Sequence, residues 1–292
     1  MGTTTDKLNR LVNTKEGIRQ EINRAYNAEE ISTSDTFNSY IQKLEEHPFY
    51  IMRYIERSIE SIKLSNATSI GSNAFQSCKG LTSVSIPNAK SIGGNAFRSC
   101  SGLTEISFPN ATSIGDNAFR SCSGLTNVSI PNATSIGGSA FNSCSGLTSV
   151  SFPNATSIGQ YAFYSCSGLT SVSFPNATSI GDYAFDSCSK LTEASFPNVT
   201  SIGMDAFRSC SSLTSLSFPN VTSIDNWAFE SCSKLTTIYV GTNTSTICKL
   251  FTTTAFTNCT NLTNIYVPAS LVNSYKSATN WSSYAYKIKA AP

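Results

Sequence analysis

Charged residues are scarce in this chain, since Asp, Glu, Lys and Arg together make up 13% of its 292 residues. The formal net charge is +2 and no basic tract is present, so the sequence has no electrostatic footprint for nucleic acid. There is no continuous apolar run long enough to predict a membrane-spanning helix. The first residues also lack the apolar segment of a secretory signal peptide, and we expect no such signal in this chain.

Residues that commonly carry catalysis are scarce as well. The single histidine, His47, precedes the regular part of the sequence, so a catalytic centre that pairs it with a serine or cysteine nucleophile is not expected. Phosphate-binding loops, dinucleotide fingerprints and zinc-binding helix motifs are missing. We therefore expect no enzyme, no metal and no cofactor. The enzyme alternative would place a site in an insertion at residues 241–254.

What the sequence has in abundance is repetition. A 22-residue unit recurs almost unchanged, with a phenylalanine three residues before each marker cysteine and a leucine three residues after it. Self-similarity at a fixed period of this size predicts a solenoid. The marker residues are Cys78, Cys100, Cys122, Cys144, Cys166, Cys188, Cys210, Cys232 and, after a longer interval, Cys259.

Each unit has the pattern of one coil. Leu-x-x-Val-x-Phe alternates apolar and polar residues, which predicts a short strand with one buried face. The proline that follows ends the strand because it has no N–H to donate. Asn-Ala-Thr-Ser then predicts a turn, and Ile-Gly-x-x-Ala-Phe predicts a single helical or 3₁₀ turn on the opposite side of the coil. Stacked units would share one core and form a parallel sheet.

The complete pattern, with Pro-Asn after the strand and Ile-Gly-x-x-Ala-Phe-x-x-Cys after the turn, resembles the BspA-like subclass of leucine-rich repeats over residues 59–268. The resemblance implies an α/β right-handed solenoid with its parallel sheet on the concave side. It also implies a bacterial surface or host-binding protein. A non-enzymatic role in adhesion or as an interaction scaffold is therefore the leading interpretation of function.

Three regions are predicted along the chain. Residues 1–57 form a helical N-terminal cap or attachment segment, with one amphipathic helix over 6–28 and a second that ends at His47. Residues 58–268 hold the repeats, and residues 269–292 resemble a C-terminal helical cap. The N-terminal region is also similar to short segments of phage structural proteins, so the alternative function is a tail-associated virion component that binds a receptor.

Two repeated residues could suggest chemistry, but a structural role is expected for both. The marker cysteines point the same way in one column, which favours buried free thiols over disulfides or zinc, and Cys248 alone lies outside the column. The repeated Asn-Ala-Thr or Asn-Val-Thr motif matches the glycosylation acceptor, yet stacked glycans would clash, so we expect each asparagine to bond the backbone of a turn. The motif begins at Asn66, Asn110, Asn132, Asn154, Asn176, Asn198 and Asn220.

Candidate binding residues are the bulky departures from small polar columns. Outward strand positions are mostly serine until Tyr239 and Tyr266, which form one candidate patch. Two variable columns flank the Ala-Phe turn, and their aromatic members predict a ridge for a partner or a sugar, with neutral surface variation as the alternative. The ridge residues are Tyr161, Tyr164, Tyr183 and Trp227.

These residues define the expected partners. We expect a protein or a glycan on a host or cell surface, no nucleic acid, and no span through a membrane. The corresponding location is a cell surface or the extracellular space, or a virion, for which no signal peptide would be needed.

Overall fold

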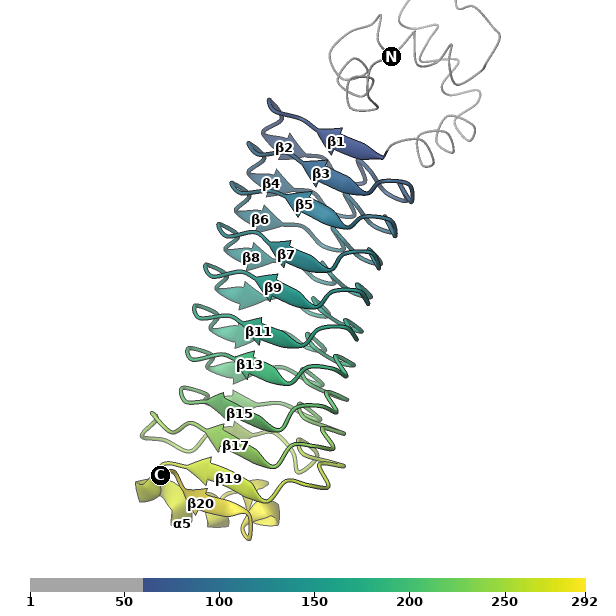
Figure 1. Cartoon of the computed structure of the whole chain (residues 1–292). Helices are drawn as coiled ribbons and strands as arrows, with labels where there is room; N and C mark the ends of the chain where they lie inside the picture. Colours follow the sequence, from purple (N-terminus) through teal and green to yellow (C-terminus); the bar gives the residue numbers. More distant parts are fainter. Residues whose placement is uncertain (1–59) are drawn as a thin grey trace, which may run out of the picture.

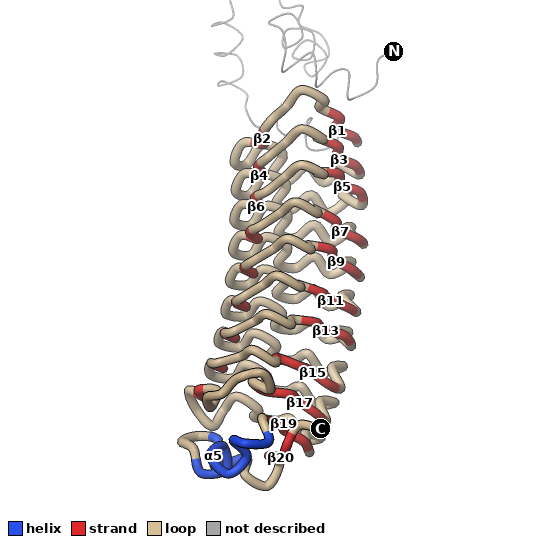
Figure 2. The backbone as a smooth tube through the Cα atoms, turned by 90° about the vertical axis from the view of Figure 1, so that its left-hand side faces the viewer, coloured by secondary structure: helices blue, strands red, loops and turns tan. Residues whose placement is uncertain are grey.

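The computed structural model describes residues 60–292, so the helices predicted within residues 1–57 lie outside the described part of the chain. Each repeat forms one coil, and the coils stack along a single axis (Figure 1). Every regular coil carries a longer strand and a two-residue strand on different sides of the solenoid (Figure 2). Among the described residues, no helix is both long enough and apolar enough to cross a membrane.

The longer strands form the predicted parallel sheet. Neighbouring strands pair in register with equivalent residues of successive units, as Ser61 does with Ser83. The pairing divides the strands into groups β1-β3-β5, β7-β9-β11-β13 and β15-β17-β19-β20. The strands are β1 (Ser61–Lys63), β3 (Ser83–Ser85), β5 (Glu105–Ser107), β7 (Asn127–Ser129), β9 (Ser149–Ser151), β11 (Ser171–Ser173), β13 (Glu193–Ser195), β15 (Ser215–Phe218), β17 (Thr237–Val240), β19 (Asn264–Val267) and β20 (Ile288–Ala290).

A second parallel sheet of nine strands, which the sequence did not predict, is built from the Ser-Ile pair of eight units and from Lys249–Leu250 in the last. The eight Ser-Ile strands are two residues long because glycine, or Asp225 in one unit, follows the isoleucine and turns the chain. They are β2 (Ser69–Ile70), β4 (Ser91–Ile92), β6 (Ser113–Ile114), β8 (Ser135–Ile136), β10 (Ser157–Ile158), β12 (Ser179–Ile180), β14 (Ser201–Ile202), β16 (Ser223–Ile224) and β18 (Lys249–Leu250).

The prediction of a helical or 3₁₀ turn after this isoleucine is wrong. Asn117 and Ser121 have positive φ angles of 57° and 61°, and equivalent residues of the other units do the same. Left-handed residues at this spacing interrupt a right-handed helix. The backbone instead forms consecutive tight turns, and alternate N–H groups donate to carbonyls of the next coil rather than within their own. Asn117 N–H, for example, donates to the Gly138 carbonyl of the next unit at 2.8 Å.

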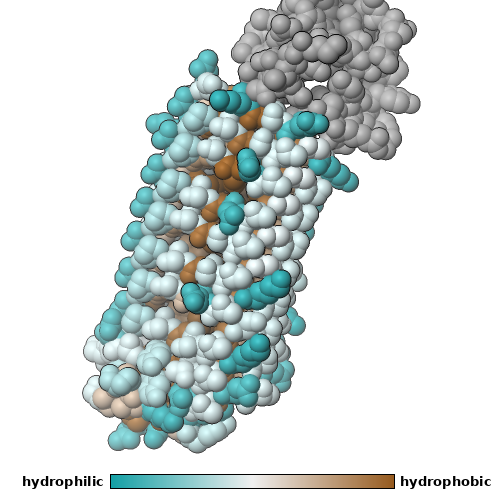
Figure 3. All heavy atoms as spheres, viewed as in Figure 1, coloured by the Kyte–Doolittle hydropathy of each residue, from teal (hydrophilic) through white to brown (hydrophobic). Residues whose placement is uncertain are grey.

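One continuous core fills the solenoid. The leucine, phenylalanine, alanine, isoleucine and cysteine columns are buried, and phenylalanine rings of successive coils stack at 5.3 Å over much of their length. The serines on either side of each inner strand residue remain outside, as the alternation predicts. Because these serines are small, apolar colour shows as a narrow stripe between polar columns (Figure 3), and the inner residues Ile106, Val150 and Ala194 are only half-buried.

The C-terminal residues close the last coil. They form η1 (Ala269–Leu271), α5 (Val272–Ser277), η2 (Trp281–Tyr284) and finally β20, which extends the sheet beside β19. Tyr275 and Trp281 are buried, and Leu271, Val272 and Tyr284 pack against the core. Helix is therefore confined to short pieces, and the end of the segment predicted to be helical continues as a strand.

Candidate binding surface

The variable residues of the flank occupy a special backbone position. The first residue of each turn after the Gly-x pair is left-handed, with φ between 52° and 61°. Asparagine suits this conformation because its short polar side chain bonds locally, and asparagine or serine holds the position in the first four regular units. The column consists of Asn73, Asn95, Asn117, Ser139, Tyr161, Tyr183, Asp205 and Trp227.

Bulky aromatic residues are costly at such a position. Tyr161, Tyr183 and Trp227 have φ angles of 57°, 56° and 52°. A left-handed conformation costs an ordinary L-residue about 1–2 kcal/mol, and less for asparagine. Residues that hold a strained backbone without improving the packing of the core are candidates for function.

Three of the four predicted ridge residues form one cluster, which we call the flank cluster: Tyr161, Tyr164 and Tyr183. The rings of Tyr161 and Tyr183 stack with centroids 4.6 Å apart and planes 7° apart. Tyr164 meets Tyr161 edge to face at 5.7 Å. Trp227 is separated from Tyr183 by one further unit of the column, and 38% of its surface is exposed. The structure therefore joins three rings and leaves the fourth apart.

Several charged side chains lie next to the flank cluster. Asp186 and Asp205 are each only 4% exposed, and burial raises the pKa of both carboxyls. Arg208 lies between acids, with its Nε 3.9 Å from Asp205 and 3.4 Å from Glu230. Desolvation, followed by a hydrogen bond to Asp205, raises the pKa of Tyr183 and ties the cluster to this group. The sequence shows these residues in adjacent columns but did not reveal their burial.

The second predicted patch is also brought together. Tyr239 on β17 and Tyr266 on β19 are opposite one another in register, and their rings stack at 4.9 Å with planes 22° apart. On the next strand, Lys289 is opposite Tyr266. Lys289 was not among the predicted residues, because only the return of the chain as β20 places it on this face. A strand-like Ile-Lys-Ala near a terminus carries little signal by itself.

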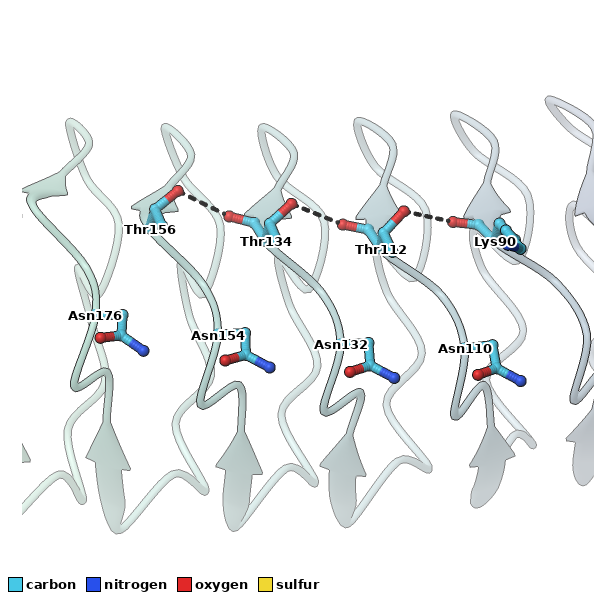
Figure 4. A pocket seen from close by; sticks show the side chains of 8 residues that line it. All are labelled: Lys90, Asn110, Thr112, Asn132, Thr134, Asn154, Thr156 and Asn176. Atoms are coloured by element: carbon cyan, nitrogen blue, oxygen red, sulfur yellow. Dashed lines mark hydrogen bonds between the residues drawn. The ribbon is translucent and has the colours of Figure 1, made fainter.

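Six of the seven motif asparagines, from Asn110 to Asn220, bond the backbone as predicted, although the partner belongs to the preceding unit. Asn132 Nδ2 donates to the Pro109 carbonyl at 2.8 Å, and Asn154 Nδ2 donates to the Pro131 carbonyl at 2.9 Å. Threonines form a parallel ladder, in which Thr134 Oγ1 donates to the Thr112 carbonyl at 3.2 Å (Figure 4). The Nδ2 atom that a glycan would need is thus engaged in holding coils together.

The cysteine column consists of buried free thiols, as predicted. All ten cysteines are free, and burial raises the pKa of Cys144 and Cys166 well above the usual value. Beyond the prediction, these thiols donate hydrogen bonds between coils, as Cys144 Sγ does to the Phe119 carbonyl at 3.1 Å. Within residues 60–292, no group of three or more His, Cys, Asp or Glu side chains is placed to hold a metal ion.

The insertion at 241–254 is fastened to the end of the solenoid. Cys248 N–H donates to Tyr275 Oη at 2.7 Å, and Trp281 Nε1 donates to the Cys248 carbonyl at 2.7 Å. Burial raises the pKa of Cys248 to about 12, so its thiol is protonated at neutral pH. A buried, protonated thiol is a poor nucleophile, and Cys248 acts here as a packing residue.

Comparison with known proteins agrees with this architecture. The BspA type leucine rich repeat region matches residues 49–170 and 156–286, in six copies. A leucine-rich repeat protein from Eubacterium ventriosum is 22% identical with a TM-score of 0.50, over 60% of this chain and 59% of that one. A leucine rich cell surface protein from Faecalibacterium prausnitzii is 24% identical with a TM-score of 0.36, over 80% and 83%. At 22% identity, the Eubacterium ventriosum structure speaks for the fold alone.

A search of curated proteins finds no match. The family match is different in kind, because it spans most of the chain and follows the same repeat that builds the coils. The stacked core, the parallel sheet and the repeat pattern together show that this chain belongs to the BspA type leucine-rich repeat family.

Proposed function

We propose that this chain is a non-enzymatic binding scaffold whose solenoid presents the flank cluster to a protein or glycan partner. The observation that carries the proposal is the pair Tyr161 and Tyr183, stacked at 4.6 Å on two left-handed residues. A left-handed asparagine would satisfy the same turn with less strain. The retained rings therefore favour selection for contact over neutral variation.

The chemistry of the flank cluster suits recognition. Tyrosine rings provide a large contact area with little loss of side-chain freedom, and their hydroxyls add hydrogen bonds. Tyr161, Tyr164 and Tyr183 are each partly exposed, so their rings are accessible from solvent. Elsewhere on this column the side chains are mostly small and polar, which marks the cluster as the place for an anchor.

Binding can be tested by replacing the tyrosines with asparagine, the residue that is usual in this column. A glycan and protein array should first identify a ligand for the whole chain. The double variant Tyr161→Asn and Tyr183→Asn should then weaken that ligand at least tenfold, about 1.4 kcal/mol, while the fold is retained because asparagine suits the turn. Ser139→Asn, in the same column, is the matched control and should bind as the original chain does.

Two outcomes would contradict the flank cluster as the site. One is unchanged affinity in the double variant for every ligand that the array finds. The other is a loss of affinity in Ser139→Asn as large as in the double variant, which would show that the measured affinity depends on the backbone of the turn rather than on the tyrosine rings. Trp227→Asn, made separately, shows whether the isolated fourth aromatic belongs to the same contact.

Location and the alternative functions stay predictions. The virion alternative depends on residues 1–57, which lie outside the described part of the chain. A place at a cell surface follows from the family resemblance. The enzyme alternative depends on the insertion at 241–254, where Cys248 is buried and protonated; a screen for hydrolase activity tests it.

A further inference from the structure

A second surface with different chemistry lies at the C-terminal end of the long-strand sheet. The outward row of the last strands runs in register from Ser217 through Tyr239 and Tyr266 to Lys289. From Ser85 to Ser195 the same row is serine, and Lys63 begins it at the far end. Aromatic rings beside an ammonium group are therefore found in this row only at the last coils of the described residues.

The neighbouring row adds hydrogen-bonding groups beside the rings. Thr237 and Asn264 lie opposite one another on β17 and β19, and Asn264 Nδ2 donates to Thr237 Oγ1 at 3.4 Å. Lys289 Nζ donates to Asn264 Oδ1 and so leans over this row. An aromatic row and a polar row thus run side by side. We call the five residues Thr237, Tyr239, Asn264, Tyr266 and Lys289 the terminal patch.

The terminal patch is positively charged. Lys289 is exposed, and within residues 60–292 it has no ion pair with a carboxylate. Strands β15, β17, β19 and β20 contain no acidic residue. An ammonium group has three donors and Asn264 takes one, so two remain for a ligand.

We propose that the terminal patch binds a hexuronate unit of an acidic polysaccharide. The apolar C–H face of the pyranose packs on the exposed rims of Tyr239 and Tyr266. Its hydroxyls exchange hydrogen bonds with Thr237 and Asn264, and its carboxylate pairs with Lys289. A neutral sugar would leave the ammonium group unused, and an acidic peptide lacks a flat ring to cover both tyrosines.

The terminal patch is separate from the flank cluster in chemistry as well as in place. Buried carboxylates adjoin the flank cluster, as Asp205 does, whereas the strands of the terminal patch have none. An acidic sugar therefore complements the terminal patch and not the flank. The two sites can be tested independently on the same protein.

The test uses the whole chain and an oligogalacturonate as the probe, with a neutral oligosaccharide of equal length as the comparison. Calorimetry should detect heat of binding with the acidic oligomer and little or none with the neutral one. Its affinity should fall as salt is raised, because the charge pair is exposed to screening. Lys289→Gln should weaken binding at least tenfold, since hydrogen bonds to charged groups are the stronger ones.

The chain offers matched controls for the variants. Lys63 stands on β1 in the same outward row, opposite Ser85, so Lys63→Gln removes the same charge from a position where, among residues 60–292, no aromatic ring lies on the neighbouring strand. It should leave oligogalacturonate binding unchanged. The double variant Tyr239→Ser and Tyr266→Ser restores the residue typical of the row and should weaken binding at least tenfold with the fold retained.

Several results would overturn the proposal. One is equal affinity for the acidic and neutral oligomers, and another is unchanged affinity of Lys289→Gln for oligogalacturonate. A third is that polyglutamate displaces oligogalacturonate as well as unlabelled oligogalacturonate does, which would show attraction to negative charge alone. If Tyr161→Asn with Tyr183→Asn abolished oligogalacturonate binding while the terminal variants kept it, the flank proposal would stand and this one would fail. Retained binding in that flank variant supports the terminal patch.

Discussion

Truncating a central phenylalanine should test how far stability is shared between coils. Phe141 is fully buried, and its ring stacks between Phe119 and Phe163, with centroids 5.3 Å away on each side. It also meets Phe152 at 5.7 Å in a tilted contact. Phe141→Ala would therefore leave a cavity that touches three coils.

The expected loss is large. Replacing a buried phenylalanine with alanine usually costs about 3–5 kcal/mol, and each lost aromatic pair contributes about 0.5–1.5 kcal/mol beyond its buried area. With two stacked partners, Phe141→Ala should lie near the upper end of that range. Phe75 begins the same column, is only half-buried and, among the described residues, stacks on Phe97 alone, so Phe75→Ala should cost clearly less.

Urea unfolding, with hydrogen exchange to locate the weakened coils, measures both variants. The midpoint should fall far more for Phe141→Ala than for Phe75→Ala, and exchange should quicken in the coils next to residue 141. Ser151→Ala, on the outer face of β9, should change stability by less than about 0.5 kcal/mol. Equal losses at Phe75 and Phe141, or a loss at Ser151 as large as at Phe141, would refute the stacked core.

Three further measurements probe individual groups. Cys259 is the most exposed of the ten cysteines at 6%, and the adjacent Cys232 thiol lowers the pKa of Cys259. A thiol reagent should therefore label Cys259 first in the native protein, and Cys259→Ser should remove the fast phase; an unchanged fast phase would contradict this. Burial raises the pKa of Asp186 in the folded state above its ordinary 3.8, so stability falls as pH rises between the two values. Asp186→Asn should consequently raise the thermal midpoint at pH 7, with the gain disappearing below pH 3.8, and a loss at pH 7 would reverse the assignment. Tyr275→Phe removes the acceptor of the Cys248 N–H and should cost about 1–3 kcal/mol in urea unfolding, whereas a neutral effect would show that water replaces the bond.

The candidate site was only partly readable from the sequence. Columns of a repeat act as an internal comparison, so Tyr161 and Tyr183 stand out where asparagine is usual, and Tyr239 stands out where serine is usual. Aligned columns of the sequence contain no information on the distances between side chains. They could not show that Tyr164 meets Tyr161 while Trp227 stays apart, or that β20 returns to place Lys289 beside Tyr266.

The repeat by itself determined the architecture of this protein. A 22-residue period forces equivalent residues to stack, and alternation within Leu-x-x-Val-x-Phe decides which face of the strand is buried. Those two facts were enough to predict a parallel-sheet solenoid, one shared core and a column of buried free cysteines. Neither requires knowledge of any contact between distant residues, because in a solenoid the neighbour of each unit is the next copy of itself.

Only the tertiary structure decided how the coils are fastened. The left-handed residues, exemplified by Asn117, turn alternate N–H groups toward the next coil, and this excludes the helical turn that the apolar spacing suggested. The side chains of Asn132 and Cys144 likewise donate to carbonyls of the preceding coil. A hydrogen-bond partner is a matter of direction and distance in space, and the spacing of residue types along the chain specifies neither.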